Sequence, residues 1–493
     1  MTPDVDWFAL SPALSLLAAS CVALLGAVIV PRRAARVLAA LSVAAGFVVA
    51  FVFAALLYDD SGDARAVIAD AVARDRYAAL AGMIVCGAGL LAVGVSWGER
   101  FGPEGDEHVG EYYSLLAAAA AGMVFLAAAS NLMVLFLALE WFSIALYVMC
   151  AIAGDRVGSL EAGLKYLIVG GFGSAVLLFG SALVYGATGE LTFSRIADAV
   201  GTRGLADDPL LLAGLAMIIT GLGFKASAAP FHMWTPDVYQ GAPTPVTAFM
   251  AAATKTVALV LMLRVLVTAF PEQTEFWTIG VAVIACISLA VGNLAALVQR
   301  DVKRMLAYSS VSHAGFMLIA VCANNELGGR ALLYYLIPYS AMSLGAFAVV
   351  AARERELASP VTLDGLAGFG WERPLLGIAL WIFMLGFAGF PLTGGFVGKF
   401  YAFSAAYEAG WTWLVIVGVV ATAVSLYYYL GVVRALYMRS EIELRAAPAG
   451  GSPPREVALH ASVVACLAVT VGSFFAVQPL IDLAKDAANQ LPF

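Results

Sequence analysis

The chain of 493 residues is 62% hydrophobic and only 12% charged. This composition excludes an ordinary soluble protein and indicates a polytopic membrane protein. The formal net charge of −7, without any basic cluster, gives no indication of a nucleic-acid partner.

Fourteen apolar segments follow one another along the chain, and most have the roughly 20 residues that a helix needs to cross the hydrocarbon layer. The sequence therefore predicts an all-α polytopic membrane protein with about fourteen transmembrane helices. The predicted spans are 10–30, 36–58, 77–97, 112–129, 131–152, 161–186, 209–228, 244–268, 275–298, 303–322, 328–351, 374–403, 411–436 and 457–478.

Two of these spans carry signals for an interrupted helix. The seventh runs into Pro230, and the twelfth contains the Gly/Pro cluster GFAGFPLTGGF at 386–396. A broken helix leaves backbone groups without hydrogen bonds, which lipid does not tolerate. We therefore expect both breaks to lie inside the protein or along a wet cavity.

The placement of the breaks indicates a duplication. Spans four to eight hold one broken helix and spans nine to thirteen hold another, and the two groups of five start on opposite sides of the membrane. We predict three N-terminal helices in 1–110, a first five-helix repeat in 111–270 and a second, inverted repeat in 271–440. A loop and a C-terminal helix would occupy 441–493.

Lys and Arg residues in the loops predict the orientation. If both termini lie outside, the inner loops hold fifteen of these residues and the outer segments hold seven. Because inner loops carry the excess of Lys and Arg, we predict that both termini lie outside. Five basic residues are then left inside the spans, whereas most of the other charged residues lie outside them. These five are Lys165, Lys225, Lys255, Arg264 and Lys399.

Glu140 and Lys255 lie about ten and about twelve residues into their spans, too deep to reach the surface easily. A charge at such a depth costs about 2.5–3.5 kcal/mol on insertion scales. One explanation is structural: a buried pair locks two helices together. The other is a proton relay, because burial brings the pKa of lysine and of glutamate towards neutrality and a nearby opposite charge reverses the shift.

Other polar groups inside the spans leave more than one interpretation open. His313 is a natural proton carrier or a packing histidine bonded to a serine, and His232 lies at the first break, where it lines a cavity or packs. Lys165 forms an ordinary i, i+4 pair with Glu161 or flanks the relay. Arg264, in the outer part of its span, is interpreted as snorkelling to the surface.

No motif predicts a cofactor or a metal on this chain. The six cysteines form no C-x-x-C pair, and no P-loop, dinucleotide or haem-attachment motif is found. The glycine-rich run at 170–180 lies inside a span, so it favours close helix packing over phosphate binding. Neither redox chemistry nor ATP hydrolysis has a visible site.

Four segments carry a resemblance to a known family. FKASAAPFHMWTPDVYQGAPTPVTAFMAAATK (224–255), SLEAGLKYLIVGGFGSAVLLFGSALVYGATG (159–189), KRMLAYSSVSHAGFMLI (303–319) and GFPLTGGFVGKFYAF (389–403) resemble subunit N of bacterial NADH–quinone oxidoreductase, respiratory complex I (NDH-1). Three features favour subunit N over the related subunits L and M: the segment TPDVYQGAPTPVTAF, the end of the chain soon after the last span, and Lys at position 399.

The resemblance implies a relay with named members. Glu140 and Lys225 would pair in one half-channel, Lys255 and His313 would pass the proton laterally, and Lys399 would stand in a second half-channel. Lys165 and His232 are secondary candidates. This chain would then be a proton-translocating enzyme subunit in the bacterial plasma membrane.

The resemblance also implies partners and cofactors. FMN, iron–sulfur clusters and quinone would be bound by other subunits. Subunits M and K would be adjacent in the bilayer, with A, H, J and L in the same membrane part. Two alternatives stay open: a subunit of a multi-component cation/proton antiporter, and a passive scaffold whose buried charges are only structural.

Overall fold

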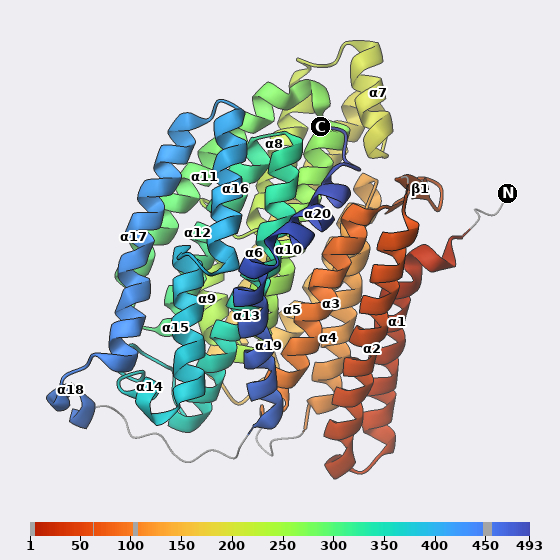
Figure 1. Ribbon diagram of the computed structural model, residues 1–493. Helices are drawn as coiled ribbons and strands as arrows, with labels where there is room; N and C mark the ends of the chain where they lie inside the picture. Colours follow the sequence, from red (N-terminus) through yellow and green to blue (C-terminus); the bar gives the residue numbers. More distant parts are fainter. Residues whose placement is uncertain (1–4, 63, 102–106, 447–455) are drawn as a thin grey trace.

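The computed structural model describes residues 5–62, 64–101, 107–446 and 456–493, and almost all regular structure in them is helical (Figure 1). The first part of the chain holds α1 (Trp7–Ile29), α2 (Arg32–Asp60), β1 (Arg65–Val67), β2 (Val72–Arg74), α3 (Arg76–Ser96), α4 (Val109–Ala127), α5 (Leu132–Ala151), α6 (Val157–Thr188), α7 (Phe193–Arg203), α8 (Pro209–Lys225), α9 (Thr235–Gly241) and α10 (Thr244–Ala269). The second part holds η1 (Pro271–Gln273), α11 (Thr274–Leu297), α12 (Val302–Cys322), α13 (Glu326–Leu357), α14 (Phe369–Glu372), α15 (Pro374–Ala388), α16 (Gly394–Glu408), α17 (Thr412–Tyr437), α18 (Glu441–Ala446), α19 (Val457–Phe475) and α20 (Val477–Ala488).

Twelve helices in the described residues are long and apolar enough to cross a membrane. Two shorter apolar helices, α8 and α15, are the first halves of the spans that the sequence predicts to be broken. The all-α polytopic fold is thus confirmed, whereas the count of fourteen spans stays a prediction. Figure 1 shows α7 at one end of the helices and α14 and α18 at the other. We call the latter end the basic face.

Both predicted breaks are present. Helix α8 ends at Lys225, and the chain passes Pro230 in turns before α9 begins at Thr235. Helix α15 ends at Ala388, and α16 begins at Gly394. Gly389 closes α15 with a φ of +79°, a left-handed conformation that glycine adopts without steric cost.

The two repeats share a local pairing that the sequence does not reveal. Asn131 caps the start of α5 and forms an antiparallel bridge with Thr192, which follows α6. Asp301 caps the start of α12 and forms the same kind of bridge with Thr362, which follows α13. Because these are equivalent places in the two groups of five spans, the bridges support the predicted duplication.

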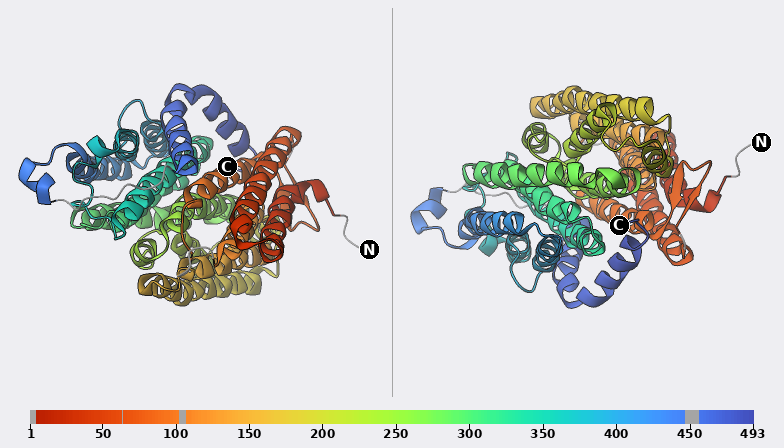
Figure 2. Two further views of the ribbon diagram at one scale, coloured as in Figure 1. Left: turned by 90° about the horizontal axis from the view of Figure 1, so that it is seen from below. Right: turned by 90° about the horizontal axis from the view of Figure 1, so that it is seen from above.

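The centre of the molecule is formed by α10, α12 and α13. All of the most apolar 18-residue window of α10 is buried, and the corresponding shares are 94% for α12 and 89% for α13. Seen along the helices, the red and orange N-terminal helices lie to one side of this centre (Figure 2). Charges on the three central helices are therefore screened from lipid by the rest of the chain.

Several short elements were not predicted. The hairpin β1–β2 pairs Arg65 with Arg74 at one membrane face, α7 occupies a segment that the sequence assigns to a loop, and α20 lies almost entirely beyond the last predicted span, 457–478. Both helices are amphipathic and too short to cross the membrane. A search for long apolar runs cannot find such elements.

The close packing of α11 on α12 yields one prediction on stability. A Cβ on Gly292 would lie 2.5 Å from the backbone nitrogen of Ser312 and 2.9 Å from the carbonyl oxygen of Tyr308, and backbone atoms cannot move aside cheaply. We expect Gly292→Val to lower the free energy of unfolding by about 1–3 kcal/mol. Gly280→Val on the same helix is the control, since its Cβ would meet nothing within 4 Å. Equal thermal unfolding of the two purified variants would contradict this packing argument.

Candidate functional site

Lys225 is the last residue of α8 and lies directly before the first break. Its side chain is 3% exposed, and its Nζ donates a hydrogen bond of 2.8 Å to the hydroxyl of Ser143 on α5. Four aromatic rings surround the ammonium at 5.6–5.9 Å, those of Phe142, Tyr147, Tyr166 and Phe224. The group therefore has a neutral hydroxyl and ring faces as partners.

Glu140 lies on α5, one turn before Ser143. Within the described residues it forms no ion pair with Lys225, although one carboxylate oxygen, Oε1, is buried and has no hydrogen-bond partner. The pair that the resemblance implies is thus not in direct contact here. Ser143 stands on the same stretch of α5 and bonds the lysine in its place.

Lys255 lies in the middle of α10 and is 1% exposed. Its Nζ donates to the carbonyl oxygen of Ser310 on α12 and lies 5.9 Å from the ring of Tyr339. The hydroxyl of Ser310 is in turn 3.0 Å from the hydroxyl of Tyr339. No carboxylate of the described chain forms an ion pair with this lysine.

His313 lies one turn further along α12 and is 1% exposed. Its Nδ1 is 2.8 Å from the hydroxyl of Tyr335 on α13, and its Nε2 is 3.1 Å from the hydroxyl of Tyr429 on α17. Both ring nitrogens therefore have a tyrosine hydroxyl as partner. The ring of Phe387 lies 5.1 Å away, between centroids.

Lys399 lies in the second turn of α16, the helix that follows the second break. Its Nζ donates to the carbonyl oxygens of Phe387 at 2.9 Å and Ala388 at 3.4 Å, which are the last residues of α15. The ring of Phe316, on α12, lies 4.1 Å from the same atom. The lysine thus binds the backbone that the break leaves open.

The structure brings Lys255, His313 and Lys399 into one buried region around α12. Ser310 contacts Lys255, and Phe387 contacts both His313 and Lys399. Lys225 lies in a separate aromatic pocket, and no contact recorded for the described residues joins it directly to Lys255. Sequence reasoning did not identify Ser143, Ser310 or the tyrosines, because such residues are read as packing.

The two secondary candidates lie nearer the basic face. Lys165 is 43% exposed and pairs with Glu161 at 2.6 Å, as the i, i+4 interpretation expects, but also with Asp237 of α9 at 2.9 Å. His232 lies within the first break, where its Nδ1 is buried without a hydrogen-bond partner and its ring centroid is 6.3 Å from that of Tyr308.

Asp237 ties the two repeats together at this face. Its carboxylate accepts from Lys165 on α6 and, at 2.6 Å, from Arg304 on α12. Burial alone would raise the pKa of Asp237, but the hydrogen bonds from Lys165 and Arg304 outweigh it and hold that pKa below its ordinary value. Asp237 therefore stays ionised near neutral pH.

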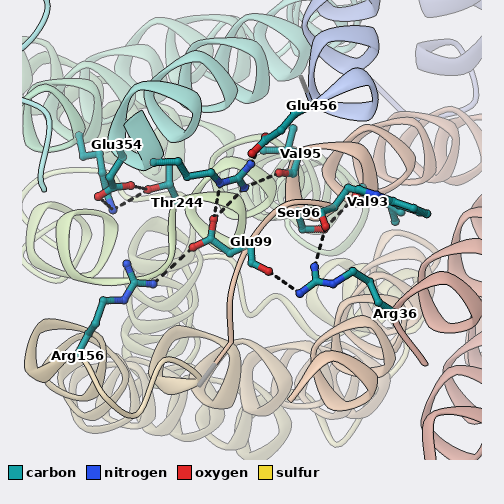
Figure 3. A network of polar contacts seen from close by, with 12 residues as sticks. Arg36, Val93, Val95, Ser96, Glu99, Arg156, Thr244, Glu354 and Glu456 are labelled. Carbon is teal, nitrogen blue, oxygen red and sulfur yellow. Dashed lines mark hydrogen bonds and ion pairs between the residues drawn. The ribbon is translucent and has the colours of Figure 1, made fainter. Parts of the chain in front are cut away.

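A pocket of about 690 Å³ lies among α6, α9, α12 and α13 at the basic face. Charged side chains around this pocket form a network of ion pairs and hydrogen bonds (Figure 3). Glu99, which follows α3, accepts from Arg355 of α13 and pairs with Arg156 at 3.7 Å. Arg355 also binds Glu456, and Glu354 binds Thr244 at the start of α10. The basic face thus offers water a polar recess beside the first break.

The interpretation of Arg264 as a snorkelling residue is wrong. Its side chain is buried and forms two hydrogen bonds, of 2.6 and 2.8 Å, with the carboxylate of Asp75 at the start of α3. Asp75 lies 189 positions earlier in the chain, in a polar loop, so the sequence around Arg264 could not reveal the pair.

The fold, with two broken helices and buried lysines at both breaks, defines an antiporter-like membrane subunit. In agreement, residues 129–425 match the family described as NADH:quinone oxidoreductase/Mrp antiporter, TM. NADH-quinone oxidoreductase subunit N of Trichlorobacter lovleyi is 43% identical over 370 residues, which are 75% of this chain and 76% of that protein. Subunit N 1 of Herpetosiphon aurantiacus is 37% identical over 96% of this chain and 95% of its own length.

A solved structure agrees with these relatives. One chain of respiratory complex I from Thermus thermophilus superimposes with a TM-score of 0.80 at 34% identity and covers 96% of this chain and 99% of its own. The chain therefore belongs to the NADH-quinone oxidoreductase subunit N family and is a multi-pass membrane subunit of that enzyme. Its relatives favour this reading over a cation/proton antiporter.

Proposed function

We propose that this chain translocates protons across the membrane while its partner subunits transfer electrons from NADH to quinone. Glu140, Lys225, Lys255, His313 and Lys399 form the relay, with Lys165 and His232 at its margin. The relatives' names support the enzyme, and the buried polar groups support the path.

One observation carries the proposal. Lys225, Lys255 and Lys399 are each 1–3% exposed, and their hydrogen-bond partners are neutral oxygens: a serine hydroxyl and the carbonyls of Ser310, Phe387 and Ala388. A purely structural lysine would gain most from a carboxylate, because a buried charge without a counter-charge is costly. A lysine with neutral partners can lose its proton without leaving a buried anion behind.

The breaks give the relay its two ends. Each break lies beside a buried lysine, and at the second break Lys399 binds the backbone oxygens of Phe387 and Ala388. Water enters at such breaks, whereas continuous helices exclude it. On the first side, the polar recess of the basic face supplies protons towards Lys225. On the second side, Lys399 releases them across the break between α15 and α16.

The remaining assignments follow from the same proposal. We place FMN, the iron–sulfur clusters and the quinone site on other subunits, and subunits M and K beside this chain, with A, H, J and L in the same membrane part. We assign the chain to the bacterial plasma membrane with both termini outside, so that the basic face is the inner one. The repeat boundaries are taken as 111–270 and 271–440.

The carboxylate of Glu140 offers a direct test. We expect Glu140→Gln to lower the rate of NADH-driven proton pumping in proteoliposomes about tenfold or more, because the negative charge one turn before Ser143, the partner of Lys225, is lost. The complex should still assemble, since the substitution keeps the size of the side chain. Glu275→Gln is the matched control, on an exposed position of α11.

Two results would separate the alternatives. A Glu140→Gln complex that pumps with the parent rate and the parent proton-to-electron ratio would contradict the relay. Poor assembly, with normal specific activity of the assembled fraction, would instead support a passive scaffold.

A further inference from the structure

The surroundings of His313 hold a chain of hydroxyl groups that the relay described above does not use. Tyr429 of α17 binds Nε2 of His313, and its hydroxyl is also hydrogen-bonded to that of Ser309 on α12. Both groups are about 1% exposed. This hydroxyl pair points from His313 towards the basic-face end of α12, where the helix begins at Val302.

A pocket of about 660 Å³ opens at the basic face beside this pair. It is lined by Gln299, Arg300, Met305, Tyr428, Gly431 and Arg434, among others. Met305 lies one turn before Ser309 on α12, and Tyr428 precedes Tyr429 on α17, so the two helices that carry the hydroxyl pair also line the pocket. Tyr428 donates a hydrogen bond of 3.0 Å to the amide oxygen of Asn293, which adds a polar group beside the pocket.

The other ring nitrogen of His313 faces a second tyrosine. Tyr335 binds Nδ1, and its ring packs against Gly398, where an added Cβ would lie 2.6 Å from it. Gly398 directly precedes Lys399 on α16. The imidazole thus stands between the hydroxyl of Tyr429 and the hydroxyl of Tyr335, and the base of the Tyr335 ring packs beside the residue that precedes Lys399.

We propose that Tyr429 and Ser309 form a second proton access from the basic-face pocket to His313, and that Tyr335 carries the proton onward to Lys399. The proposal rests on the proton translocation inferred above. Because both ring nitrogens have a tyrosine partner, a proton enters and leaves His313 only through these hydroxyls.

The step conserves protons. Tyr429 gives its hydroxyl proton to the unprotonated Nε2 and takes one from Ser309, which takes one from a hydronium ion that enters from the pocket and becomes water. The Nδ1 proton passes to the oxygen of Tyr335, whose own hydroxyl proton passes to neutral Lys399. The ring then carries its proton on the other nitrogen, and no group is left with an uncompensated charge except the lysine that received the proton.

Tyr429→Phe tests the route by removing one oxygen. We expect NADH-driven pumping in proteoliposomes to fall about tenfold or more, with Ser309→Ala giving a loss of the same order. Tyr334→Phe is the matched control, since it neighbours Tyr335 on α13 but donates to the carbonyl of Ser473 at 2.8 Å. A Tyr429→Phe complex that pumps like the parent would overturn the proposal.

A second variant blocks the pocket without touching the hydroxyls. A Cβ on Gly431 would meet nothing within 4 Å, so Gly431→Trp fits into the open pocket, and we expect it to lower pumping at least severalfold. Gly472→Trp on α19, equally free of neighbours and outside the pocket, is the control. Equal pumping by the two tryptophan variants overturns the route.

The outcome also separates this route from the relay itself. If Glu140→Gln abolishes pumping while Tyr429→Phe and Gly431→Trp do not, the second access is wrong and the relay stands. If none of the three changes pumping, both proposals fail.

Discussion

Replacing Lys225 by Met is expected to abolish pumping through this subunit and to lower NADH:quinone oxidoreductase activity roughly a hundredfold, the range in which loss of one proton-transfer group falls. Methionine keeps the length of the side chain and suits the aromatic surroundings of Phe142, Tyr147 and Tyr166. Removing a buried charge that has only neutral partners should not destabilise the fold. We therefore expect the variant to lose activity while it keeps the stability of the parent protein.

The measurement is the proton-to-electron ratio of the reconstituted complex, together with its subunit content. Lys485→Met, on the exposed side of α20, serves as control and should behave like the parent. The relay assignment of Lys225 is refuted by a fully assembled Met variant that pumps normally. A variant that fails to assemble would instead show that the lysine stabilises the first break.

Asp75→Asn is expected to cause the largest loss of stability, about 3–5 kcal/mol in the free energy of unfolding. The substitution keeps an N-cap for α3 but leaves the guanidinium of Arg264 buried without a counter-charge. Because α3 and α10 meet at this pair, we expect faster hydrogen exchange at the start of α3 and a lower thermal unfolding midpoint of the purified complex.

An exposed ion pair on the same membrane face provides the comparison. Arg195 and Asp70 lie 2.7 Å apart but are 59% and 40% exposed, so Asp70→Asn should cost less than about 1 kcal/mol. The double variant Asp75→Asn, Arg264→Leu should recover most of the loss, since it removes both charges and keeps the N-cap of α3. Similar midpoints for Asp75→Asn and Asp70→Asn would contradict the importance of the buried pair.

Much of the fold can be read from the sequence because lipid imposes simple rules. Long apolar runs predict the spans, and Pro230 and GFAGFPLTGGF predict both breaks within a few residues. The same rules place the charges at Glu140, Lys225, Lys255 and Lys399 in the interior, because lipid would not accept them. These parts depend on local composition alone.

The remaining features depend on contacts between distant segments. Arg264 finds Asp75, and His313 finds tyrosines on α13 and α17, from parts of the chain that share no local pattern. Tyrosine in a span is usually a packing residue with a bonded hydroxyl, so nothing marks Tyr335 or Tyr429 as partners of a histidine. The only sequence signal for Ser143 as the partner of Lys225 is a weak one, namely that it lies one turn after Glu140 on α5.

The way in which Lys399 is held has a mechanical consequence. Its ammonium closes the end of α15 by binding the carbonyls of Phe387 and Ala388, so the lysine acts as the C-terminal cap of a helix in another segment. A charged donor holds such oxygens about twice as strongly as a neutral one, and a cation also favours the negative end of the helix dipole. Protonation of Lys399 therefore strengthens the link between α15 and α16, and loss of the proton weakens it, so how firmly the two halves of the broken helix are held together depends on the charge of a single side chain.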